Sequence, residues 1–118
     1  MILAVLDDLM FTSKIKTAAT QLGVSVGFAR SSAAATAEMQ KAAPSLVIFD
    51  LDNPRTRPLD ILAWMKADEA LAAIPTVGFV SHVHTEVIDA ARKAGVGEVL
   101  ARSAFTQQLA DILTRESR

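Results

Sequence analysis

Short apolar runs alternate along the chain with longer segments in which apolar residues recur every three or four positions. The short runs predict strands, whereas recurrence at three and four positions predicts amphipathic helices. Strands that alternate with helices favour parallel pairing, because parallel strands need a long crossover connection. The sequence therefore predicts an α/β fold, a doubly wound parallel sheet of five strands. The expected strands are Ile2–Leu6, Val24–Phe28, Leu46–Asp50, Thr76–Val80 and Glu98–Ala101.

Five helices are expected between and after these strands, from caps, glycines and prolines at their ends. The third helix is expected to continue into residues 68–73, and the fifth to end at Leu113. Gly23 and Gly95 follow the first and fourth helices, where a glycine commonly ends a helix. The helices are expected to begin near Thr12 or Ser13, at Ser31 or Ser32, near Leu59, near Thr85 and at Thr106.

Length and composition indicate one domain over residues 1–118, with no output domain expected within this length. The chain has no cysteine, which excludes disulfides and thiolate metal sites. A net charge of -1 gives no electrostatic reason to expect nucleic acid or a membrane surface as a partner. The apolar opening, Met1–Leu6, is too short for a signal peptide or a membrane span. We therefore expect a cytoplasmic protein.

Polar side chains follow four of the expected strands: Asp7 and Asp8, then Asp50, Ser81 and Arg102. The carboxyl ends of parallel strands meet at one edge of a sheet, which is where ligands bind in this class of fold. Neighbouring carboxylates repel one another unless a cation joins them, and a set of oxygen ligands suits Mg²⁺. Asp50 is placed to attack phosphorus and form an acyl phosphate, with Ser81 and Arg102 as donors to its oxygens.

With these residues in place, the whole chain resembles the receiver domains of bacterial two-component response regulators. The matching points are the acidic pair Asp7 and Asp8, the phosphoacceptor position Asp50 followed by Pro54, and the hydroxyl position Ser81. The resemblance implies a CheY-like, flavodoxin-like (βα)5 sandwich with strand order 2-1-3-4-5. It implies a signalling domain that accepts a phosphoryl group, and not an enzyme.

The resemblance also implies ligands and partners. Asp8 and Asp50 would hold Mg²⁺ directly, Asp7 would hold it through water, and Asp52 would hold it through its backbone carbonyl. A histidine kinase or phosphotransfer protein would donate the phosphoryl group, and a separate downstream protein would read it. In this family the segments that correspond to residues 85–94, 98–101 and 106–113 mediate partner contacts or dimerisation, so a homodimer through this face is also expected.

Three positions depart from the family pattern. Arg102 stands where the family has a lysine, Ser103 where a proline follows it, and Val99 where an aromatic residue is common. A guanidinium can fork onto oxygens but differs from an ammonium group in reach and shape. These departures favour an alternative function, a receiver-like module that binds its partner without being phosphorylated.

Two further enzyme or cofactor classes are compatible with parts of the sequence. The segment Asp50-Leu51-Asp52 is similar to the Asp-x-Asp signature of haloacid dehalogenase-type phosphatases, but Pro54 stands where that family has a hydroxyl residue. Flavodoxin-type cofactor binding needs a phosphate loop after the first strand, where Asp7 and Asp8 would repel phosphate. Both the phosphatase and the flavodoxin-type function are less favoured than the receiver-domain interpretation.

Asp52 and the histidines beside Ser81 have simpler interpretations. We expect the Asp52 side chain to point outward as a solvated loop residue, because an inward carboxylate would repel an incoming phosphate. His82 and His84 are expected to be solvated loop residues, since no third metal ligand accompanies them.

Overall fold

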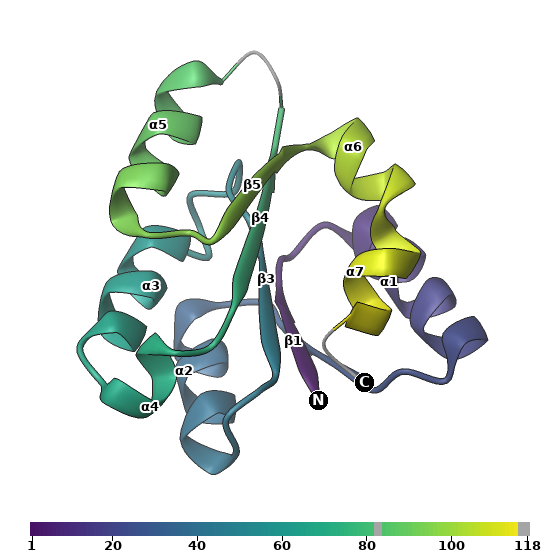
Figure 1. Ribbon diagram of the computed structural model, residues 1–118, viewed down its shortest axis with the longest axis horizontal. Coiled ribbons are helices and arrows are strands. Elements are labelled where there is room, and N and C mark those ends of the chain that lie inside the picture. The colour runs from purple at the N-terminus through teal and green to yellow at the C-terminus, as the bar shows by residue number, and fades with distance from the viewer. Residues whose placement is uncertain (82–83, 116–118) are drawn as a thin grey trace.

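The computed structural model describes residues 1–81 and 84–115 of the chain. Its five strands form one sheet in the order β2-β1-β3-β4-β5, and each neighbouring pair is parallel (Figure 1). The predicted fold class and strand order are therefore confirmed. The strands are β1 (Ile2–Val5), β2 (Val26–Ala29), β3 (Leu46–Asp50), β4 (Thr76–Val80) and β5 (Glu98–Ala101).

Helices cover both faces of the sheet and give a three-layer arrangement (Figure 1). One layer contains α1 (Leu9–Leu22), α6 (Arg102–Gln107) and α7 (Leu109–Arg115). The other contains α2 (Ser32–Lys41), α3 (Pro58–Lys66), α4 (Glu69–Ala72) and α5 (Thr85–Ala94). In the described part of the chain, no helix has the length and apolar character needed to cross a membrane.

The sheet divides the core into two parts, because successive side chains of a strand point to opposite faces. On β3, Val47 and Phe49 pack with residues of α2, α3 and α5, whereas Leu46 and Ile48 pack with residues of α1, α6 and α7. Burial on both faces is typical of a central parallel strand. It fixes the position of the last residue of β3, Asp50, at the carboxyl edge of the sheet.

The first helix begins earlier than predicted. Its N-cap is Asp8, whose carboxylate accepts a hydrogen bond from the Phe11 N–H at 3.1 Å, so the predicted cap at Thr12 or Ser13 was wrong. The physical reason is that an aspartate caps a helix as well as a hydroxyl residue does. The consequence for the site is that one Asp8 oxygen is already bonded to the helix.

Strand β2 begins later than predicted because the preceding residues complete the end of α1. Gly23 has a left-handed backbone (φ 69°), as its predicted role at a helix end requires. The N–H of Val24 then donates to the Ala19 carbonyl at 2.9 Å, so Val24 belongs to the helix cap and pairing with β1 begins at Val26.

Two segments predicted as single helices are each divided. The Asp68 carboxylate accepts hydrogen bonds from the N–H groups of Ala70 and Leu71, which starts α4 as a separate short helix. The last helical segment begins at Arg102, directly after β5, and is interrupted at Gln108. Arg102 therefore belongs to the first turn of α6 and not to a loop.

Candidate functional site

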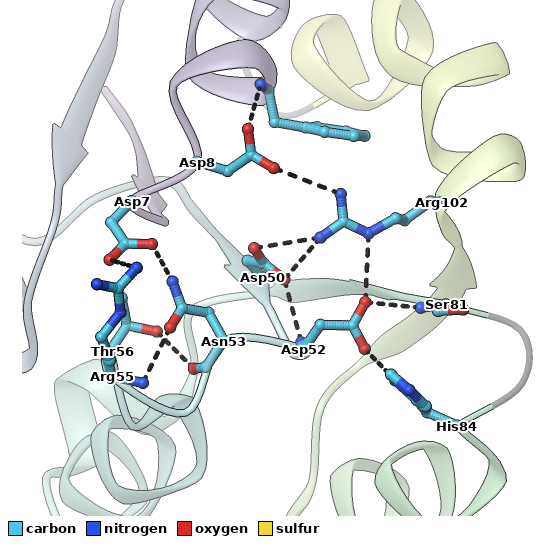
Figure 2. A network of polar contacts seen from close by, with 11 residues as sticks. Asp7, Asp8, Asp50, Asp52, Asn53, Arg55, Thr56, Ser81, His84 and Arg102 are labelled. Carbon is cyan, nitrogen blue, oxygen red and sulfur yellow. Dashed lines mark hydrogen bonds and ion pairs between the residues drawn. The ribbon is translucent and has the colours of Figure 1, made fainter.

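The carboxyl ends of β1, β3, β4 and β5 bring the predicted polar residues to one edge of the sheet (Figure 2). Asp8 lies between β1 and α1, Asp50 ends β3, Ser81 follows β4, and Arg102 follows β5. Asp8, Asp50 and Arg102 line an open pocket of about 390 Å³, together with Asp7 and Asp52. The sequence therefore identified the elements that deliver the site. It did not identify how the side chains pair.

Arg102 is the centre of the polar network in Figure 2. Its Nη2 lies 3.4 Å from both carboxylate oxygens of Asp50. Its Nε donates to Asp52 Oδ2 at 3.2 Å, and its Nη1 lies 3.7 Å from Asp8 Oδ2. One guanidinium thus contacts three carboxylates that come from two different strand ends.

Aromatic rings lie against the same guanidinium. Its Cζ atom is 4.9 Å from the centroid of the Phe11 ring and 5.3 Å from that of Phe79. The Phe79 ring stacks on Phe11 at 4.8 Å and on Phe105 at 4.6 Å, so the rings form one packed group. Cations are attracted to aromatic faces at such distances. Arg102 is therefore held by ring faces as well as by carboxylates.

Asp52 points into the site, so the prediction of an outward, solvated side chain was wrong. Its Oδ2 accepts hydrogen bonds from the Ser81 N–H at 2.8 Å and from Arg102, and its Oδ1 lies 2.7 Å from His84 Nδ1. The side chain is only 15% exposed. Burial by itself would raise the pKa of Asp52, but the hydrogen bonds from His84, Ser81 and Arg102 outweigh it and lower the pKa. The carboxylate is stable in this position because donors from the β4–α5 connection and from α6 converge on it.

Asp50 is more deeply buried than Asp52, and its pKa is shifted in the opposite direction. Its side chain is 3% exposed. Burial raises the pKa of Asp50 above the ordinary value for an aspartate, although Arg102 and the N–H of Asp52 partly offset this effect. The Asp52 N–H donates to Asp50 Oδ1 at 3.1 Å. Asp50 is thus a buried carboxylate with one cationic neighbour and two acidic ones, Asp8 and Asp52.

Asp7 lies at the side of the network and has its own partners. It accepts a hydrogen bond from the Asn53 side-chain amide and forms an ion pair with Arg55 at 3.0 Å. Asn53 in turn accepts from the Arg55 N–H at 2.9 Å, so the loop after β3 folds back over β1. Asn53 was not among the predicted site residues. The available signal was its position in the loop that directly follows the acceptor strand.

The remaining predicted residues contribute less directly. Ser81 was expected to act through its hydroxyl, whereas the contact seen here is made by its backbone N–H. Val99 is half-buried and packs against the core beside α5, where the family pattern would place an aromatic ring. Ser103 is exposed on α6. His82 lies outside the described residues. His84 is an exposed loop residue, as predicted, but its Nδ1 also contacts Asp52.

The acidic residues do not, as arranged, form a metal site. In residues 1–81 and 84–115, no group of three or more histidine, cysteine, aspartate or glutamate side chains is arranged to hold a metal ion. The oxygens that would be the ligands of Mg²⁺ are bonded instead to Arg102, to the cap of α1 or to Asn53 and Arg55. The residue types suit a hard cation, but in this arrangement their oxygens face protein donors. The Mg²⁺ prediction therefore stays a prediction.

Comparison with known proteins adds fold-level evidence. No protein-family model matches the chain, and no curated protein matches it. Solved structures do match. A response regulator from Hahella chejuensis superposes with a TM-score of 0.84 at 19% identity, over 96% of this chain and 91% of that one.

Two further structures are similar over nearly the whole chain. The receiver domain of sensor histidine kinase PA1611 from Pseudomonas aeruginosa, solved with magnesium in its active-site cleft, has a TM-score of 0.83 at 19% identity, over 98% of this chain and 94% of that one. The phosphorylated cyanobacterial phytochrome response regulator RcpA has a TM-score of 0.76 at 25% identity, over 95% and 86%. The strand order, the polar strand ends and these superpositions agree that the chain has the CheY-like fold of response regulator receiver domains.

Proposed function

We propose that the chain is a receiver-type signalling module that acts through a separate partner protein and whose acidic centre needs no phosphoryl group to hold its structure. The observation that carries this proposal is the contact of the Arg102 guanidinium with Asp8, Asp50 and Asp52. The group that would stabilise a phosphorylated Asp50 is already bonded to the carboxylates themselves.

The charges of the site support the same proposal. Three ionised carboxylates against one guanidinium leave two uncompensated negative charges at the acidic centre. Two like charges 4 Å apart repel by about 4 kcal/mol at an effective dielectric constant near 20. An incoming phosphoryl group carries negative charge into this centre, and the inward side chain of Asp52 adds to the repulsion. The resting site is therefore unfavourable for phosphoryl transfer.

The second candidate function is the one that the sequence favoured, Mg²⁺-dependent phosphoryl acceptance on Asp50. It is supported by the position of Asp50 at the end of the central strand β3, beside Asp8, and by the 25% identity with a receiver domain solved in its phosphorylated form. An Asp50 carboxylate oxygen would bond to phosphorus while the bond from phosphorus to the donor breaks, and the donor would leave with the electron pair. The donor would be a histidine kinase or a phosphotransfer protein. This chemistry requires Arg102 to leave the carboxylates first.

The phosphatase alternative is disfavoured by the state of Asp52. In the Asp-x-Asp mechanism the second aspartate acts as a general acid, which needs a protonated carboxyl group near neutral pH. The hydrogen bonds from His84, Ser81 and Arg102 instead lower the pKa of Asp52. Asp52 is thus an acceptor and not a proton donor.

Partner contacts and location are also proposed. The partner is expected to contact the face formed by α5, β5, α6 and α7, and the same face is where a homodimer would form. We expect the protein to work in the cytoplasm. Analytical ultracentrifugation over a range of concentrations distinguishes a monomer that awaits its partner from a homodimer.

The two functions are distinguished by intact-protein mass after incubation with acetyl phosphate and Mg²⁺. The proposed function predicts no added phosphate on the folded wild-type protein. A hydroxylamine-labile gain of one phosphate on the wild type, absent from Asp50→Asn, would establish the second candidate in its place. Arg102→Lys serves as the comparison, because an ammonium group carries its three donors on one nitrogen and spans less distance between carboxylates than the planar guanidinium does. Labelling of this variant alone would show that Arg102 is what blocks acceptance.

A further inference from the structure

We infer that Arg102 is the resident cation of the acidic centre, so that a divalent metal ion binds there only when the guanidinium is removed. This inference rests on the proposed function and deepens it, because it explains why the site holds its structure without metal or phosphate. It makes Arg102 a positioning residue for the carboxylates. It also predicts that a single substitution converts the centre into a cation site.

A metal ion and the Arg102 guanidinium would compete for the same carboxylate oxygens. Nη2 of Arg102 faces both oxygens of Asp50 at 3.4 Å, and Nε is 3.2 Å from Asp52. Asp8, which caps α1 with one oxygen, directs the other toward Nη1 at 3.7 Å. A metal ion that used Asp8 and Asp50 would need the space and the oxygens that the guanidinium now uses. Metal and guanidinium therefore exclude each other.

Aromatic rings also hold the guanidinium, independently of the carboxylates. The guanidinium lies over the rings of Phe11 and Phe79, with Cζ 4.9 Å and 5.3 Å from their centroids. A planar guanidinium can stack on a ring while its edge donates to carboxylates, which a hydrated metal ion cannot do. The Phe79 ring is itself fixed between Phe11 and Phe105. The guanidinium thus has aromatic ring faces as neighbours as well as carboxylates, and both suit an arginine side chain.

Removal of the guanidinium would leave Asp8 and Asp50 without the cationic group that now contacts them. The Asp50 side chain is 3% exposed and that of Asp52 is 15% exposed, so water cannot fully solvate their charges. Carboxylates in this state attract a hard cation. Loss of the competing guanidinium should therefore tighten cation binding by about tenfold to a hundredfold, which corresponds to about 1.4–2.8 kcal/mol.

The test is a Mn²⁺ titration of chelator-treated protein, with free Mn²⁺ measured by its electron paramagnetic resonance signal, followed by competition with Mg²⁺. Arg102→Gln should bind one Mn²⁺ at least about tenfold more tightly than the wild type. Arg92→Gln is the matched control, because it removes the same charge from an exposed position on α5. It should bind as the wild type does. Asp50→Asn combined with Arg102→Gln should lose the gained binding.

Tight Mn²⁺ binding by the wild type, or equal affinity of the wild type and folded Arg102→Gln, would overturn the inference. If Arg102→Gln does not fold, Arg102→Lys gives the answer, because its ammonium group contacts fewer oxygens and should give an affinity between those of the wild type and a freed site. No gain in Arg102→Lys would then overturn it. The proposed function is tested separately by intact-protein mass: it fails only if phosphate appears on Asp50 of the wild type.

Discussion

Substitution of Arg102 by glutamine should destabilise the protein by about 3 kcal/mol at pH 7 in the absence of divalent cations. The reason is that the substitution leaves Asp50 buried with its charge and without its cation. Removing one partner of a buried ion pair costs more than the pair contributes, because the remaining charge is poorly solvated.

The magnitude follows from the exposure of each contact. The Asp50 side chain is 3% exposed, so its bonds to Arg102 count as hydrogen bonds to a buried charge, about 1.5–3 kcal/mol. Asp52 and Asp8 are 15% and 35% exposed, and solvent screening reduces these pairs to about 0–1 kcal/mol each. Loss of the contact with the Phe11 and Phe79 rings adds about 0.5–1 kcal/mol. Contributions that share one side chain are not additive, so the expected total stays near about 3 kcal/mol.

The assay is urea unfolding in EDTA, followed by far-UV circular dichroism and by the fluorescence of Trp64, the one tryptophan of the chain. Arg92→Gln, the exposed control, should change the free energy of unfolding by less than about 0.5 kcal/mol. In an Asp50→Asn background, Arg102→Gln should cost less than half as much, because no buried charge is left behind. An equal cost in both backgrounds would refute the assignment of the effect to Asp50. Mg²⁺ should restore part of the lost stability in Arg102→Gln and none in the wild type.

Three further outcomes are expected. Asp52→Asn should lower the free energy of unfolding by about 1–2 kcal/mol at pH 7. Because the folded-state pKa of Asp52 is lowered, the stability that its carboxylate contributes is present above about pH 4 and is lost as the pH falls through the folded pKa. Urea unfolding curves of the variant and the wild type should therefore converge in acid. Asp50→Asn should be more stable than the wild type at pH 7, because the raised pKa of Asp50 means that its ionised carboxylate opposes folding. This difference in the free energy of unfolding should shrink as the pH falls through the folded pKa, and a difference that grows in acid would contradict the prediction. Gly78→Ala should destabilise the sheet by about 1–3 kcal/mol, because its Cβ would lie 2.5 Å from Leu51 Cδ1, and Leu51→Ala in the same chain should reduce the additional cost of the alanine at 78.

The local pattern of the sequence was sufficient for the architecture. Short apolar runs and helical periods predicted the strands at residues 46–50, 76–80 and 98–101 as the structure has them. At residues 46–50 and 76–80 the strands are buried on both faces, which leaves a strong signal in the sequence. The boundary errors were at α1, where Asp8 caps the helix, and at the helix that Asp68 divides. Several polar residues could serve as caps in each segment, and only the folded backbone selects among them.

The sequence also predicted which strand ends meet. Asp50 ends a strand of the parallel sheet and Asp8, Ser81 and Arg102 follow other strands, so their convergence at the carboxyl edge follows from topology. The pairing among them depends on distances and directions that topology does not fix. Only the tertiary structure placed Arg102 between the carboxylates and over Phe11, and only it turned Asp52 inward. The physical reason is that hydrogen-bond donors and ring faces act over a few ångströms, so the choice between a metal ion and a guanidinium is made by side chains far apart in the chain that the packed core brings within that range.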